Sequence, residues 1–132
     1  MVPHVPHSVL KNELKVLFPM VSAGLKAQDG HMRRSAAETL RNILAAEIDV
    51  AAPAMHGLVP PLLEVAVSSR YISARVAALG CLLEMLKLPH HVIFPFKEQV
   101  VKGLAVVLDD AKFKVRRAAV QCRNRWIATT AA

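Results

Sequence analysis

An internal repeat of 41 residues constrains the fold of this chain more than any other feature. At this offset Arg34, Arg75 and Arg116 superimpose. Four further columns hold only small or apolar residues: Ala36/Ala77/Ala118, Ala37/Ala78/Ala119, Leu40/Cys81/Cys122 and Leu44/Met85/Trp126. Because the last two columns are four residues apart, they lie one turn apart on the same face of a helix. The sequence therefore predicts three copies of one helical unit.

A period of about 41 residues is typical of HEAT and armadillo units, whose helices bury their apolar faces only by stacking on neighbouring copies. We predict an all-α fold, an α-solenoid of about three HEAT repeats, each an antiparallel helix pair, in a single domain over 1–132. The repeats are expected at about 8–47, 56–87 and 95–127. First helices are expected at 8–27, 56–67 and 95–108, and second helices at 32–47, 70–87 and 112–127. Pro19, Pro60 and Pro61 are expected in kinked or restarted first turns of the first helices.

Composition supports a folded helical domain. A chain with 54% hydrophobic and 20% charged residues is too apolar to stay disordered. Five glycines are few for a sandwich or barrel, which needs frequent turn residues. The uncharged run between Asp49 and Glu64 is 14 residues long, shorter than the roughly 20 that span a bilayer, so no membrane partner is expected. The N-terminal residues lack the features of a signal peptide, and the two cysteines form no close-spaced pair, which favours a reduced compartment.

No residue pattern indicates catalysis or a metal site. Cys81 and Cys122 share a repeat column with Leu40, so we expect them in the core, and the paired spacings of zinc or cluster ligands are absent. The histidine pairs, His4 with His7 and His90 with His91, lack a third ligand nearby and are expected in solvated segments. No phosphate-binding glycine loop or nucleophile motif occurs. The sequence predicts a non-enzymatic protein with no catalytic residue, metal or cofactor.

The basic residues cluster near the C-terminus. Residues 92–132 contain eight Lys/Arg and three Asp/Glu, so they carry +5 of the chain's net charge of +7. On a helical wheel centred on Val115, six polar side chains avoid the core, and second helices of HEAT units line the inner, concave surface. We therefore predict partner contacts at Arg117, Gln121 and Asn124, with Arg123, Lys114 and Arg125 at the rim. The alternative is that these residues only keep the last repeat soluble as its outer cap. Arg116 and Trp126 are expected to be structural.

The third copy carries an Asp–Arg spacing that resembles the HEAT signature. Asp110 precedes Arg116 by six residues, and in HEAT repeats such residues form a ladder between successive copies. The first two copies place Gln28 and Ser69 at the Asp position. The ladder is therefore expected to be incomplete, with Asp29 as a neighbouring substitute.

Two stretches, ARVAALGCLLEMLKLP at 74–89 and FPFKEQVVKGLAVVLDDAKFKVRRAAVQCRNRWI at 94–127, resemble the C-terminal end of the MMS-nineteen family of HEAT scaffolds. The resemblance is strongest over 74–127, and the first 60 residues align by repeat phase. It implies the C-terminal domain of a scaffold in the cytosolic iron-sulfur assembly targeting complex. The implied partners are a small cluster-relay subunit, a WD-repeat propeller reached through the complex, and apo iron-sulfur clients such as the XPD helicase and DNA polymerases. The implied location is cytoplasmic and nuclear.

Two other functions remain open. One is a generic HEAT adaptor for an acidic protein, as in a transport receptor. The other is nucleic-acid binding, which fits the basic C-terminal third but lacks aromatic residues interleaved with the cations for base stacking, so no direct nucleic-acid contact is expected.

Overall fold

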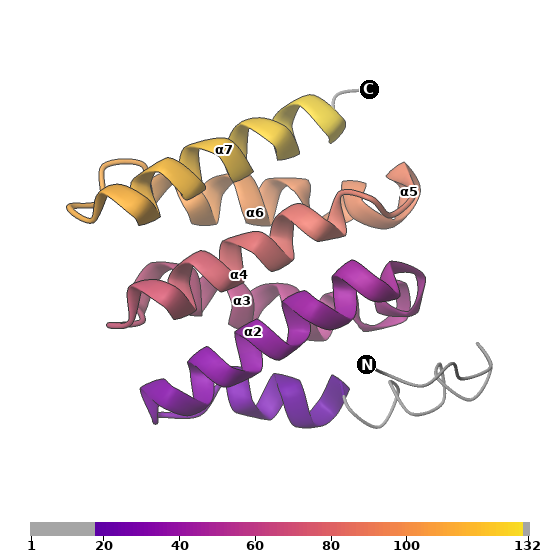
Figure 1. The fold of residues 1–132 in the computed structure, drawn as a ribbon. Coiled ribbons are helices and arrows are strands. Elements are labelled where there is room, and N and C mark those ends of the chain that lie inside the picture. Colours follow the sequence, from indigo (N-terminus) through magenta and orange to yellow (C-terminus); the bar gives the residue numbers. More distant parts are fainter. Residues whose placement is uncertain (1–17, 131–132) are drawn as a thin grey trace.

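The structure is a computed structural model that describes residues 18–130, and within that range it contains helices and no strand (Figure 1). After a helical segment at 18–25 come the main helices α2 (Gly30–Ala46), α3 (Met55–Ser68), α4 (Ile72–Met85), α6 (Lys97–Leu104) and α7 (Phe113–Thr130). Shorter elements join them: η1 (Ile48–Ala54), α5 (His90–Ile93), η2 (Phe94–Phe96) and η3 (Ala105–Val107). The predicted all-α helical solenoid is confirmed.

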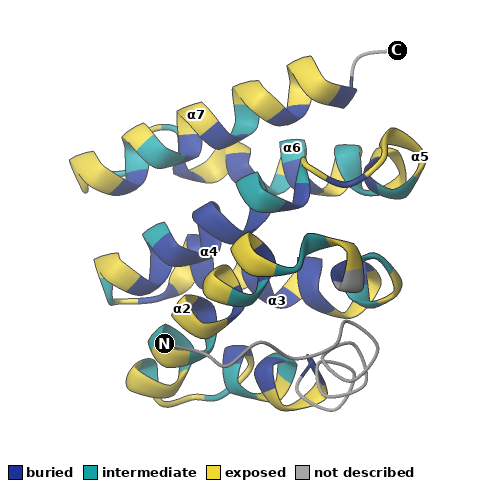
Figure 2. Cartoon of the chain, turned by 45° about the vertical axis from the view of Figure 1, so that its right-hand side comes forward, coloured by how far each residue is buried: buried dark blue, intermediate teal, exposed yellow. Residues whose placement is uncertain are grey.

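The helices form two layers. In one layer α2, α4 and α7 lie one above the other, and each packs on the next (Figure 1). In the second layer α3 and α6 lie beside them, α3 against α4 and α6 against α7. The central helix, α4, is buried along most of its length, whereas α7 is exposed on its outer side (Figure 2).

The repeat columns form the core between these layers. The second alanine of each copy is fully buried, as are the columns of Leu40, Cys81 and Cys122 and of Leu44, Met85 and Trp126, all at 0% exposure. Polar atoms in these columns bind the preceding copy. The Trp126 Nε1 donates a hydrogen bond to the Leu82 carbonyl at 2.9 Å, and the Cys81 Sγ donates one to the Ala37 carbonyl at 3.4 Å. Both bonds tie one second helix to the one before it.

Some helix ends differ from the predicted ones because the backbone changes there from α-helix to 3₁₀ conformation. The helix expected at 70–87 ends at Met85, and the next three N–H groups, of residues 86–88, bond to carbonyls three residues back, as in 3₁₀ turns. The single helix expected at 95–108 is divided into η2, α6 and η3. Pro95 supplies no N–H to continue α5, and 3₁₀ turns are common at the ends of α-helices. Of the helix expected at 8–27, residues 8–17 lie outside the described residues, and residues 18–25 are helical.

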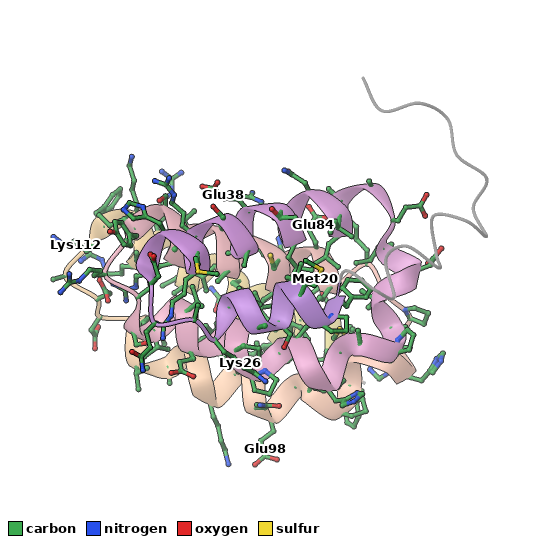
Figure 3. The ribbon with its side chains drawn as sticks, turned by 90° about the horizontal axis from the view of Figure 1, so that it is seen from below. Met20, Lys26, Glu38, Glu84, Glu98 and Lys112 are labelled. Carbon is green, nitrogen blue, oxygen red and sulfur yellow. The ribbon has the colours of Figure 1, made fainter. Side chains whose placement is uncertain are left out.

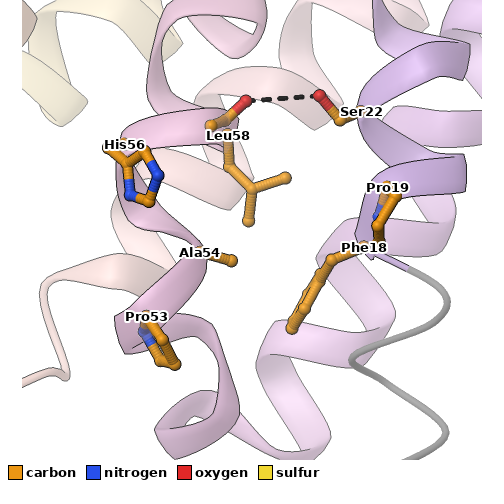
Figure 4. A pocket seen from close by; sticks show the side chains of 8 residues that line it. Phe18, Pro19, Ser22, Pro53, Ala54, His56 and Leu58 are labelled. Carbon is orange, nitrogen blue, oxygen red and sulfur yellow. Dashed lines mark hydrogen bonds between the residues drawn. The ribbon is translucent and has the colours of Figure 1, made fainter.

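The prolines of α3 lie in the helix interior and not in its first turn as expected. Pro60 and Pro61 are the sixth and seventh residues of α3. Because Pro61 has no N–H for the Gly57 carbonyl, that carbonyl accepts a hydrogen bond from the Ser22 Oγ at 3.3 Å instead (Figure 4). Beside this bond lies a mostly apolar cavity of about 430 Å³, lined in part by Phe18 and Leu58. A donor from the neighbouring helix thus compensates for the proline.

The Asp–Arg ladder is present between the second and third copies. Arg75 forms an ion pair with Asp110, and its Nε donates to the Ala66 carbonyl at 2.9 Å. Asp110 also accepts the Lys112 N–H at 2.8 Å. Asp29, expected as a substitute in the first copy, instead caps α2 by accepting the His31 N–H at 2.8 Å. The ladder is incomplete, as predicted.

Candidate protein-interaction surface

Helix α7 has one buried side and one basic side. Its buried residues are Val115, Ala119, Cys122, Trp126 and Thr130. The same helix carries five cations and no acidic residue: Lys114, Arg116, Arg117, Arg123 and Arg125. The core contacts fix the rotation of the helix, so the basic side faces outward.

The six predicted contact residues fall into two groups in the structure. Five of them have exposed side chains: Lys114, Arg117, Gln121, Asn124 and Arg125. Arg123 is half-buried, and its Nε donates to the Val101 carbonyl at 3.2 Å. That bond ties α7 to α6, so Arg123 has a structural role.

Two shallow grooves follow the seam between α4 and α7. The first, about 410 Å³, is bordered by Lys114, Arg117 and Gln121, with Val76 of α4 on the opposite side. The second, about 370 Å³, is bordered on α7 by Gln121, Arg125 and Thr129, and on the α4 side by Leu83, Glu84, Leu86 and Lys87. The structure therefore brings four of the six predicted residues together along this seam. Asn124 and Arg123 border neither groove.

A third groove, about 470 Å³, runs between α2 and α4 on the same side of the molecule. Glu38 and Arg41 border it from α2, and Val76 is shared with the first groove of the α4–α7 seam. Figure 3 shows Glu38 and Glu84 on this side, with Glu98 on the opposite side. One acidic side chain thus lies on each of α2 and α4, with Arg41 next to Glu38 on the same groove, whereas α7 carries no acidic residue.

An exposed apolar stripe on α7 was missed by the sequence analysis. Phe113, Val120 and Ile127, each seven residues apart, are 61%, 40% and 37% exposed. Phe113 also borders the first groove of the α4–α7 seam, and the Arg116 guanidinium lies 5.5 Å from the centre of the Phe113 ring. The seven-residue spacing is visible in the sequence, but the helical wheel places only polar side chains among the predicted contacts. Aromatic and arginine side chains together are enriched in protein interfaces.

The cysteines lie in the core. Burial raises the pKa of the Cys81 thiol and of the Cys122 thiol to about 12, which keeps both protonated, whereas the thiolate is the metal ligand and nucleophile. Among residues 18–130 no three His, Cys, Asp or Glu side chains are grouped to hold a metal ion. No helix in this part of the chain combines the length and apolar character needed to cross a membrane.

The histidines differ in part from expectation. His90 and His91 begin the short helix α5 and are exposed, and the His90 Nε2 lies 3.4 Å from the Thr130 carbonyl oxygen. The other predicted pair, His4 and His7, lies outside the described residues.

Comparison with known proteins identifies the family. A family model described as RNAPII transcription regulator C-terminal, MMS19_C, matches residues 1–86. The chain belongs to the MMS19 family. It is 34% identical over 122 residues to the MMS19 nucleotide excision repair protein homolog of Homo sapiens and 33% identical to that of Xenopus tropicalis, with 92% of this chain covered in each case. The homolog of Dictyostelium discoideum is 32% identical over 128 residues. The chain spans only 12% of the length of these MMS19 relatives.

Proposed function

We propose that this chain is a non-enzymatic protein-interaction module in the C-terminal region of an MMS19-type scaffold. The relatives are named for nucleotide excision repair and the family model for RNAPII transcription regulation. The repair role is indirect in this proposal, because the scaffold helps to deliver iron-sulfur clusters to repair and replication proteins.

The proposed direct partner is the small cluster-relay subunit of the cytosolic iron-sulfur targeting complex. The WD-repeat propeller joins through the complex, and the recipients are apo clients such as the XPD helicase and DNA polymerases, in the cytoplasm and the nucleus. The cluster is cargo held by the partner. The buried, protonated thiols of Cys81 and Cys122 support this division of labour.

The observation that carries the proposal is the basic border of the α4–α7 seam. Lys114, Arg117 and Arg125 are exposed there beside grooves that contain apolar side chains from both helices. With no acidic residue on α7 to neutralise them, these cations favour an acidic partner surface and increase the rate of encounter at low salt.

Charge reversal on the seam tests the proposal. We expect Lys114→Glu with Arg117→Glu to weaken binding of the relay subunit by about tenfold or more and to reduce its salt dependence, because attraction becomes repulsion. The measurement is a titration at two ionic strengths. Lys26→Glu, an exposed charge reversal in the first copy, is the matched control and should bind normally.

Unchanged affinity in a folded double variant would move the docking surface to the first-helix side around Lys97 and Lys102. A generic adaptor for acidic proteins is the second candidate, because charge complementarity alone does not select the relay subunit. Retention of other acidic proteins without the relay subunit in a pull-down would favour that second candidate.

A further inference from the structure

The first rung of the Asp–Arg ladder has a cation and no anion. Arg34 and Ser69 stand 41 residues before Arg75 and Asp110, which form the ion pair of the next rung. Ser69 is 6% exposed, and its Oγ accepts the Tyr71 N–H at 3.3 Å. A serine hydroxyl carries no charge, so this position does not supply what Asp110 supplies.

Arg34 also lacks the backbone partner that its counterpart has. The Nε of Arg75 bonds to a carbonyl of the preceding helix, whereas the Nε of Arg34 is buried without a hydrogen-bond partner among residues 18–130. The Ala27 carbonyl, in the turn before α2, is bound by the neighbouring Arg33. A buried donor without an acceptor is uncommon in folded proteins and indicates a place where an acceptor is missing.

A polar cavity of about 380 Å³ opens at this rung. Its lining comes from the turn before α2, the start of α2 and the α3–α4 turn: Gln28, Gly30, Arg33, Ser68, Ser69, Arg70 and Tyr71. Two of these residues, Arg33 and Arg70, are cationic, and none of the lining residues is acidic. Ser69, the residue at the missing Asp position, is one of these lining residues. The cavity therefore combines an excess of positive charge with the site of the missing carboxylate.

We propose that this cavity binds a phosphate group beside Ser69, at the position of the absent aspartate in the rung of Arg34. Guanidinium groups bind oxyanions through paired, charge-assisted hydrogen bonds. Arg33 lies on α2 and Arg70 in the α3–α4 turn, so the two cations approach a ligand from two directions. This arrangement suits a tetrahedral phosphate better than a planar carboxylate. The phosphate is either the free ion or the phosphorylated side chain of a protein partner.

Thermal melts of the 132-residue chain in inorganic phosphate and in chloride, at matched pH and ionic strength, test the site. The wild-type Tm should rise saturably with phosphate. Arg70→Gln should lose most of that rise, because one of the two arginines that line the cavity is gone. Ser69→Asp should have a raised Tm in chloride and no further response, since its carboxylate occupies the rung. Lys112→Gln, an exposed cation in the turn before α7, is the matched control and should respond as the wild type does.

An equal phosphate response in the wild type, Arg70→Gln and Ser69→Asp would overturn the proposal, because it would report a general salt effect. Absence of any response in the wild type would overturn it as well. A second titration distinguishes the two sources of the phosphate by comparing the affinity of the chain for a phosphoserine peptide with its affinity for the free ion. Tighter binding of the peptide supports a phosphorylated partner, equal binding supports the free ion, and binding of neither overturns the site. The charge reversals on α7 leave this site intact, so the two proposals fail independently.

Discussion

Trp126 fills a position that Leu44 and Met85 fill in the earlier copies, although its side chain is larger and carries an N–H group. All three side chains are fully buried. A buried indole N–H requires an acceptor, and the Leu82 carbonyl supplies it at 2.9 Å. The bond joins α7 to α4, so one side chain both fills the core and fixes the terminal helix on its neighbour.

We expect Trp126→Ala to lower the free energy of unfolding by about 3 to 5 kcal/mol, because it leaves a large cavity between α7 and α4. Trp126→Phe keeps much of the volume but leaves the Leu82 carbonyl without its donor, so its loss should be smaller. Urea denaturation followed by circular dichroism measures both. A loss below about 1 kcal/mol for the alanine variant, as is usual for a surface position, would contradict the burial of this side chain.

The thiols provide a second test of burial. With a pKa of about 12 for Cys81 and Cys122, about one thiol in ten thousand is ionised at pH 8, and the thiolate is the reactive species. A chromogenic thiol reagent should therefore react slowly with the folded chain and rapidly with both cysteines in denaturant. Fast reaction of either cysteine without denaturant would show that its side chain is reached from solvent.

The Arg75–Asp110 pair links α4 to the turn before α7, and this link depends on pH. The hydrogen bond from the Arg75 side chain, with that from the Lys112 N–H, lowers the pKa of Asp110 below its ordinary value, which is about 3.9 in an unfolded chain. The stabilisation is therefore complete above about pH 4 to 5 and is lost as the pH falls through the lowered folded pKa.

Asp110→Asn removes the charge that titrates. We expect its Tm to lie below that of the wild type at pH 7 and the difference to shrink below pH 4, where the wild-type carboxyl becomes protonated. Melts of both proteins from pH 7 to pH 2.5 measure this. A Tm difference that stays constant over the whole range would mean that Asp110 stabilises the turn without its charge.

The helices were predictable and their irregularities were not. The repeat columns indicate which positions are buried in each copy, so five of the six ends of the second helices were predicted to within two residues. The sixth, the end of α7, lies three residues beyond the predicted one. The missing N–H of Pro61 inside α3 is compensated by a hydrogen bond from Ser22, 35 residues before its acceptor, and no local pattern reveals that donor. The same holds for the site, where the exposed cations followed from the wheel but the anchoring of Arg123 depends on a carbonyl 22 residues away.

The whole molecule is organised around α4, which packs on α2, α3 and α7. Nine of its fourteen residues are buried. Segments with the most buried contacts open only in global unfolding, whereas the ends of a structure open locally. We expect native-state hydrogen exchange to be slowest in the second half of α4 and faster in the last turns of α7. Equal protection in both helices would indicate that the repeats open only together.

The hydrogen bonds between copies join residues at a nearly constant distance along the chain. Arg75 with Asp110 spans 35 residues, and the Cys81 and Trp126 bonds each span 44. The loop that must close to form each interface is therefore no longer in the third copy than in the second, and the entropy of closure depends on loop length. Adding copies raises the number of such steps without lengthening any of them. A solenoid with more copies of this unit can thus assemble copy by copy, with a local folding barrier that does not grow with its length.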